Sequence, residues 1–375
     1  MNQPAYFAPD WALHPGFVLA QMLDQRGLRQ SELAERTGLT AKHINQMVKQ
    51  NVSVSPDVAL LLERALDCPP RFWSNLAAEY ERYQSEAKER VKLPAYQAWA
   101  RSFHTPTLHR YGVLAPGDDA AAAVEKLLRF FKVASPDAFE QTWVKPRVSF
   151  RRSQAFTVAQ HNTALWLRLV ERCAEQLVVS PFRTGALRKR AALIPAMTNL
   201  DIPNGFLAAQ AALAEAGVAL VFIRQVPDTR VCAATWWLSA DRPVIGITER
   251  QRKPDIFWFS LLHEIGHLVL HPRRTTYLDL EQEKGAANAE HDPAEQEADD
   301  FAESVLLPPG AAQLITAATT RQDLTLLAAK LGIGGPIIAG QHGHLTNNWS
   351  VGAPLRGKIT NEQIDELESF CSVNS

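Results

Sequence analysis

The 375-residue sequence has little cysteine, almost no net charge and no long apolar run. Its four cysteines, at positions 68, 173, 232 and 371, form no CxxC pair, so neither a disulfide framework nor a cysteine zinc site is indicated. The longest apolar stretch, Val218 to Ile223, is far shorter than the roughly 20 residues of a membrane span, and no signal-like start is present. We therefore expect a cytoplasmic globular chain of two or three domains that contacts no membrane.

The segment from Phe257 to His271 contains an HExxH motif, formed by His263, Glu264 and His267. Residues four apart lie on one face of a helix, so two imidazoles can bind one divalent cation from a single rigid element. Glu264 stands beside that face and can take the proton of a water molecule that attacks a carbonyl. The flanking residues are apolar, which indicates a core helix rather than a surface helix with two solvated histidines. The motif favours a zinc hydrolase.

A third metal ligand is predicted between residues 294 and 308, where apolar residues recur at helical spacing. Glu295 lies about 60 degrees from the centre of this apolar stripe and Glu297 about 100 degrees, so Glu295 points further inward. Asp299, four residues later, falls on the same side and can accept a hydrogen bond from a ligating histidine. A solvated acidic face is the ordinary alternative. Two histidines remain as rival ligands: His271 and His291.

The two motifs together carry a family resemblance. HEIGHLVLH followed by EQEADDFAESVLLP resembles the metallopeptidases related to ImmA and IrrE, whose pattern is HExGHxxxH, a variable loop and ExxxNxFAxxLLxP. The resemblance implies a minimal, gluzincin-like zincin domain over residues 205–345. One Zn²⁺ per chain is then held by His263, His267 and Glu295, with Glu264 as general base. Asp299 stands where the family often has Asn, and the same donors also suit Mn²⁺ or Fe²⁺.

Residues 14 to 80 predict five short helices. The first has an apolar face made of Phe17, Leu19, Met22 and Leu23. In the next pair Gly38 supplies a tight turn and Thr40 caps the following helix, an arrangement typical of a DNA-binding helix-turn-helix. Side chains that this second helix offers to base edges and phosphates, together with Thr40, are Lys42, His43, Asn45, Gln46 and Lys49.

The stretch over residues 14–83 resembles the XRE-type domain of HigA-like antitoxins, which implies double-stranded operator DNA as a partner. Two positions depart from that pattern: Arg29 replaces the usual capping Thr, and Lys49 to Asn51 replace a glycine. Residues 1–90 hold ten Lys and Arg against eleven Asp and Glu, so the basic footprint of a DNA-binding domain is absent. A helical hairpin without a DNA partner therefore remains the alternative.

Residues 84–204 are predicted to form a helical connecting region. Its segment 145–190 holds ten Lys and Arg against two acids, and suits DNA phosphates or an acidic partner, with solvated helix faces as the ordinary interpretation. Strands are expected at Val218 to Ile223, Val231 to Leu238 and Val244 to Thr248, in a small sheet packed on the HExxH helix. As an edge strand, the last would align a substrate backbone through these residues: Val244, Ile245, Gly246, Ile247 and Thr248.

Residues 346–375 are expected to cap the domain, after a loop-like segment with two surface histidines, His342 and His344. The expected fold is α+β and mainly helical, with the helix-turn-helix domain in residues 1–83. The predicted protein is a transcriptional regulator with zinc-dependent endopeptidase activity. Family resemblance adds that the substrate is a repressor or antitoxin-like protein, or the chain itself, in stress response or mobile-element control. The alternative is a HigA-like antitoxin and autorepressor whose non-catalytic metal domain docks a toxin. Pairing as a homodimer stays open.

Overall fold

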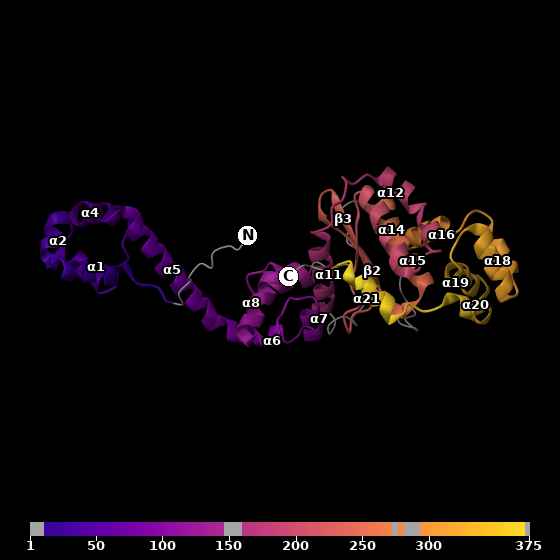
Figure 1. Ribbon diagram of the computed structural model, residues 1–375, viewed down its shortest axis with the longest axis horizontal. Coiled ribbons are helices and arrows are strands. Elements are labelled where there is room, and N and C mark those ends of the chain that lie inside the picture. The colour runs from indigo at the N-terminus through magenta and orange to yellow at the C-terminus, as the bar shows by residue number, and fades with distance from the viewer. Residues whose placement is uncertain (1–10, 146–159, 272–276, 281–292, 372–375) are drawn as a thin grey trace. The chain divides into compact units, whose positions relative to one another are not determined.

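The computed structural model describes residues 11–145, 160–271, 277–280 and 293–371. The chain divides into two compact units, Met1–Gln97 and Ala98–Ser375 (Figure 1), each with its own hydrophobic core. The structure is mainly helical with one small sheet, as the sequence predicts. The domain boundaries expected at residues 83 and 204 stay predictions.

The described part of the first unit consists of helices α1 (Pro15–Gln25), α2 (Gln30–Thr37), α3 (Ala41–Val48), α4 (Pro56–Leu66) and α5 (Pro70–Lys92). Proline begins α1, α4 and α5, where the backbone N–H would have no partner within the helix. The side chains of His14, Thr40 and Ser55 each accept a hydrogen bond from a backbone N–H in the first turn of α1, α3 and α4. Gly38 ends α2 at φ 71°, a conformation that favours glycine.

Two expectations for this unit are wrong. Phe17 does not face inward and is 43% exposed, because it lies about 200 degrees around the helix from the buried Leu19. The fifth helix is not short, since α5 has 23 residues and continues through the charged stretch. Ion pairs one turn apart stabilise its exposed end, among them Arg82 with Glu79 and Glu86.

The second unit begins with a helical region whose core is rich in aromatic rings. After η1 (Leu93–Tyr96), which closes the first unit, the elements are α6 (Gln97–Ala100), α7 (Thr105–Arg110), α8 (Ala120–Phe131), α9 (Pro136–Phe139), the π-helix η2 (Glu140–Val144), α11 (Gln160–Ala174), α12 (Thr184–Ala191), α13 (Ile194–Met197) and α14 (Ile202–Glu215). The rings of Trp99, Phe103, Phe131 and Phe139 contact one another mostly edge to face. This packing buries the start of the unit against α11.

The basic segment 145–190 is not a single charged surface. Arg168 is 4% exposed and forms ion pairs with Glu171 and Glu175, so it cannot contact a DNA phosphate. Arg190 forms an ion pair with Glu215. Three of the basic residues lie outside the described residues: Arg147, Arg151 and Arg152.

A four-stranded sheet lies beside this region, with strands β1 (Ala219–Phe222), β2 (Val231–Ser239), β3 (Arg242–Ile247) and β4 (Tyr277–Leu280). The order is β1-β3-β2-β4, with β1 parallel to β3 and the other pairs antiparallel. The expectation that Val244 to Thr248 form an edge strand is wrong, because β3 pairs with β1 on one side and β2 on the other. Among the strands that the structure describes, β1 and β4 lie at the edges.

Both faces of the sheet are covered, and alternate residues of β1 show how. Ala219 and Val221 join the core on the side of α11, whereas Leu220 and Phe222 join the core shared with α14 and α15 (Pro254–Leu270). Because side chains alternate between the faces of a strand, continuous burial requires a layer on each side. The HExxH helix is one of these covering helices (Figure 1).

The remaining helices are α16 (Pro293–Leu306), α17 (Ala311–Ala317), α18 (Arg321–Leu331), α19 (Gly335–Thr346), α20 (Trp349–Arg356) and α21 (Asn361–Ser369). The expected loop around His342 is wrong, because this segment is the helix α19. His342 is 3% exposed, and its Nε2 lies 3.1 Å from the carbonyl oxygen of Ala318, so it is a core histidine. His344 is exposed, as expected.

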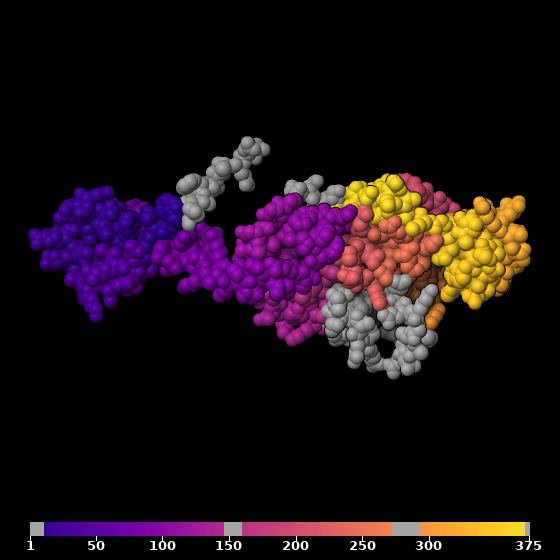
Figure 2. All heavy atoms as spheres, turned by 90° about the horizontal axis from the view of Figure 1, so that it is seen from below, coloured from indigo at the N-terminus to yellow at the C-terminus, as the bar shows by residue number. Residues whose placement is uncertain are grey.

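Helix α21 lies on the surface of the second unit (Figure 2) and is held there covalently. Cys371, just after α21, forms a disulfide with Cys173 of α11, and their Cα atoms are 5.7 Å apart. The sequence indicates no disulfide, since the cysteines form no CxxC pair and 198 positions separate these two residues. That inference is wrong because the fold brings the chain's last helix back to α11. Arg224, after β1, adds ion pairs to Asp365 and Glu368 of α21.

Candidate metal centre

Helix α15 places the HExxH motif inside the protein. Lys253 is extended and Pro254 starts the helix, which continues to Leu270. His263 is 5% exposed, Glu264 0% and His267 2%, because the helix packs on the sheet and on α16. A helix that is apolar on nearly all sides is a buried helix, so these three polar side chains need polar neighbours.

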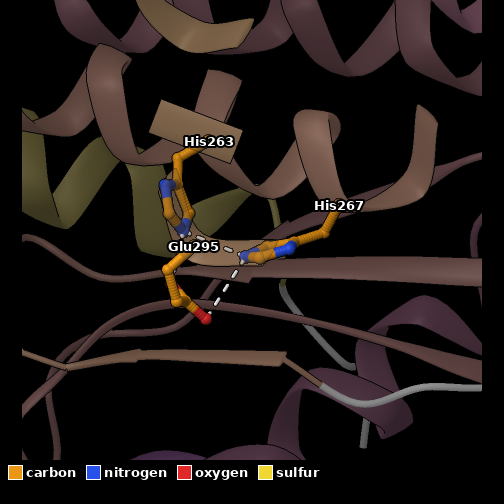
Figure 3. A group of neighbouring side chains, drawn as sticks. All are labelled: His263, His267 and Glu295. Atoms are coloured by element: carbon orange, nitrogen blue, oxygen red, sulfur yellow. Dashed lines mark hydrogen bonds and ion pairs between the residues drawn. The ribbon is translucent and has the colours of Figure 1, made fainter. Parts of the chain in front are cut away.

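Helix α16 provides polar neighbours for the two histidines. The Nε2 atoms of His263 and His267 lie 3.0 Å apart, and Oε2 of Glu295 lies 3.1 Å from Nε2 of His263. Oε1 of Glu295 lies 3.7 Å from Nε2 of His267. Figure 3 shows the three side chains converging, two from α15 and one from α16.

These separations fit a divalent cation. In a tetrahedral site with metal–ligand distances of about 2.0–2.1 Å, two ligand atoms are roughly 3.3 Å apart. The distances of 3.0 and 3.1 Å lie near that value, and 3.7 Å separates Nε2 of His267 from the other oxygen of Glu295. Two imidazole nitrogens and a carboxylate oxygen are also donors that zinc accepts. The residues therefore fit the cation that the motif predicts.

The electrostatics favour the protonation states that metal ligands need. Burial alone would raise the pKa of Glu295, but its contacts with the His263 and His267 rings outweigh burial and hold that pKa well below its ordinary range. Burial lowers the pKa of His267, partly offset by its hydrogen bond to Glu295. An ionised carboxylate and a neutral imidazole are the forms that coordinate metals.

Two further residues of α16 contact the histidines on the side away from the converging atoms. Oδ1 of Asp299 lies 2.8 Å from Nδ1 of His263, and this contact leaves Nε2 of His263 facing Glu295. Oε2 of Glu297 lies 3.1 Å from Nε2 of His271, whose Nδ1 lies 2.9 Å from Nδ1 of His267.

The rival ligands fare differently. His271 contacts the far nitrogen of His267 and is not part of the converging group, while His291 lies outside the described residues. The wheel placed Glu297 away from the apolar stripe, and sequence reasoning gave it no partner. No spacing within α16 could have found it, since its partner His271 follows α15.

The predicted DNA-contacting residues lie on or beside α3. Thr40 caps the helix by accepting the backbone N–H of His43, and Lys42 and Lys49 are exposed. The other three are half-buried: His43, Asn45 and Gln46. Sequence reasoning missed Gln30 at the start of α2, whose Oε1 accepts a hydrogen bond from Nδ2 of Asn45 at 3.1 Å. The contact joins the two helices of the motif. It could not be found from the sequence, because 15 positions separate the two residues.

The departures from the helix-turn-helix pattern have simple structural outcomes. Arg29 precedes α2 with extended backbone, and its N–H donates to Glu32 at 2.9 Å, so the carboxylate satisfies the helix start. Gln50, in the segment where glycine is usual, has φ 64°. The chain thus adopts the left-handed turn without glycine, at a conformational cost on the order of 1 kcal/mol.

The fold and this centre define a protein of two parts: a helix-turn-helix unit, and a sheet-and-helix unit in which two helices form a His-His-Glu group. Comparison with known families agrees with this. Residues 19–73 match the helix-turn-helix family, and residues 217–335 match the IrrE N-terminal-like domain of the M78 peptidases. The predicted combination of an XRE-type helix-turn-helix with an ImmA/IrrE-type domain is thereby confirmed.

Solved structures similar to the chain cover only a fifth of it. One is Pseudomonas aeruginosa antitoxin HigA with the higBA promoter, at 28% identity, covering 22% of this chain and 90% of that chain with a TM-score of 0.21. Another is an addiction module antidote protein of the HigA family from Coxiella burnetii, at 25% identity. It covers 22% of this chain and 91% of that chain, with a TM-score of 0.21. No curated protein matches the chain. No helix within the described ranges is long and apolar enough to span a membrane.

Proposed function

We propose that the chain is a DNA-binding transcriptional regulator that also hydrolyses peptide bonds as a zinc-dependent endopeptidase. The observation that carries the proposal is the convergence of His263, His267 and Glu295 next to the buried Glu264. Two imidazoles and a carboxylate, with a second carboxylate beside them, are the side chains that hydrolytic zinc sites use. The match to a peptidase family supports the same activity.

Each residue has one task in this proposal. His263, His267 and Glu295 hold one Zn²⁺, and Asp299 fixes the His263 ring by accepting its Nδ1–H. Zn²⁺, when bound, supplies a Lewis acid for the scissile carbonyl. Glu264 takes the proton of the attacking water and delivers it to the leaving amine. Full burial of Glu264 shields that proton from bulk solvent.

We assign alignment of the substrate backbone to β4 instead of β3. Among the described strands, β4 pairs with β2 alone, and it lies beside α15. An extended peptide can add to such an edge through backbone hydrogen bonds, whereas both sides of β3 are already paired. The substrate class is then a protein that offers an extended segment, such as a repressor or an antitoxin-like protein, or this chain itself.

The helix-turn-helix unit brings the activity to DNA. We propose that α3 enters the major groove of an operator, with Lys42 and Lys49 on phosphates. His43, Asn45 and Gln46 then face base edges, and Thr40 and Gln30 fix the start of α3 and the side chain of Asn45. The regulator would thus act on proteins bound at the same promoter.

The test is a comparison of purified wild-type protein with Glu264→Gln and the exposed Glu303→Gln as matched control. Metal analysis should find about one zinc ion per chain in all three, since none of the changes removes a ligand. Wild type and control should cut members of a quenched-fluorescence peptide library, and Glu264→Gln should be slower by about 10²-fold or more.

Two results would contradict the proposal. If Glu264→Gln and wild type hydrolyse the peptides at equal rates, Glu264 is not the residue that transfers the proton. A zinc-loaded wild type that cuts neither the library nor itself would instead match an antitoxin-like repressor with a docking module.

A further inference from the structure

His271 and Glu297 form a hydrogen-bonded chain that ends on the metal-ligand group. Nδ1 of His271 lies 2.9 Å from Nδ1 of His267, and Nε2 of His271 lies 3.1 Å from Oε2 of Glu297. The contacted nitrogen of His267 is the one opposite Nε2, which faces His263 and Glu295. His271 therefore contacts the proposed ligand His267 on the side of its ring that faces away from His263 and Glu295.

We infer that His271 and Glu297 are positioning residues, which fix the ring orientation and tautomer of His267 for metal binding. The inference rests on the proposed function, because it takes His267 as a ligand. For Nε2 of His267 to hold a cation, the ring proton must sit on Nδ1. That N–H donates to Nδ1 of His271, which then carries its own proton on Nε2. The second N–H donates to the carboxylate of Glu297.

The local backbone explains why His271 positions rather than binds. Helix α15 ends at Leu270, and His271 is extended, with φ −104° and ψ 162°. This turn carries its ring past the last helical turn towards Glu297 on α16. Its side chain is 7% exposed, while that of Glu297 is 62% exposed, so the imidazole is the buried link and the carboxylate the outer end.

The same helix positions the other histidine directly. Asp299 accepts from Nδ1 of His263 at 2.8 Å without an intermediate. Helix α16 thus supplies one ligand, Glu295, and the terminal carboxylates that orient both histidines. A shift of α16 would therefore disturb all three ligands together. The orientation of His267 depends, through His271, on Glu297, which lies 30 positions downstream.

The experiment measures zinc affinity of the full-length chain by competition with a chromophoric chelator. His271→Phe keeps a ring but removes both nitrogens, and should weaken zinc binding by about 10- to 100-fold. His271→Asn places an amide oxygen near the position of Nδ1 and should recover most of that loss. Glu297→Ala changes an exposed helical site and should weaken binding less, whereas Glu303→Ala, exposed on the same helix, should have no effect.

A second readout separates positioning from packing. Co²⁺ in place of zinc reports ligand geometry through its visible absorption, which should change in His271→Phe and return towards wild type in His271→Asn. If wild type binds zinc and His271→Phe matches it in affinity and spectrum, the inference is overturned. It is equally overturned if Phe and Asn lose affinity alike. If the wild type itself binds no zinc, the proposed function fails instead.

Discussion

Glu249 is a buried acid that plays no part in the proposed chemistry. It follows β3, is 7% exposed, and its Oε2 accepts the backbone N–H of Gln225 at 2.9 Å. Burial raises the pKa of Glu249 above its ordinary 4.5, and the Gln225 N–H and the charges of Arg224 and Arg252 offset only part of this rise. The folded protein therefore binds the proton at pH values where the unfolded chain has released it.

This difference predicts a pH-dependent stability. Because the folded pKa is the higher one, the stabilisation is present below pH 4.5 and declines as the pH rises through the raised pKa. Glu249→Gln keeps an acceptor for Gln225 without the charge, so its free energy of unfolding should not show this decline. Urea unfolding between pH 4.5 and pH 7.5 measures it, with Glu303→Gln as exposed control. Parallel curves for wild type and Glu249→Gln would contradict the prediction.

The residues of the centre differ in how far the sequence could place them. His263 and His267 share a face because of local helical spacing, and the apolar wheel directs Glu295 inward, so local rules suffice for the group that the structure brings together. Glu297 could not be placed in this way. Its contact with His271 depends on how two helices cross, and helix spacing within α16 contains no information about α15.

At the scale of elements, the crossing of α15 and α16 depends on Gly266, the glycine of the HExGH motif. A Cβ at this position would lie 3.1 Å from Cα of Ala298 and 3.2 Å from its carbonyl oxygen. Gly266→Val should therefore push α16 and Glu295 away, with a loss of about 1–3 kcal/mol in stability and weaker zinc binding. Urea unfolding and chelator competition test this. Gly185→Val, on an open helix surface, is the control, and equal zinc affinity in both variants would refute the prediction.

Helix α3 offers a second test at this scale. Lys42 is exposed on it, so Lys42→Ala should weaken binding to any double-stranded oligonucleotide and lower the slope of log affinity against log salt by about one. Fluorescence anisotropy across a salt series gives both quantities. Lys88→Ala removes the same charge from an exposed site on α5 and should change neither. If the two variants behave alike, α3 is not the DNA-contacting helix.

The sheet shows where sequence prediction of elements stops. The three strands expected from apolar runs exist, and their bounds differ by one or two residues. The edge position expected for β3 was wrong, because β3 is apolar enough for either an edge or an interior position and the sequence does not record which strands pair with it. β4 was not predicted at all. Its four residues are too few for a clear alternating pattern.

For the whole molecule, the separate cores predict separate unfolding. Leu33 is fully buried in the core of the first unit and Leu213 in that of the second. Leu33→Ala should destabilise the first unit by about 2–5 kcal/mol and leave zinc affinity unchanged. Leu213→Ala should destabilise the second unit, so that it lowers the unfolding transition of that unit alone. Scanning calorimetry of the intact chain resolves the two transitions, and coupled shifts in either variant would show that the units unfold as one.

The link between Cys173 and Cys371 closes a covalent ring that contains the sheet and both helices of the centre. Any backbone break between these positions leaves the products tied together by sulfur. A self-processed molecule would keep its apparent mass on an electrophoresis gel run without thiol, and would separate into two fragments only after reduction. A search for self-cleavage inside the ring therefore has to be made with reduced samples.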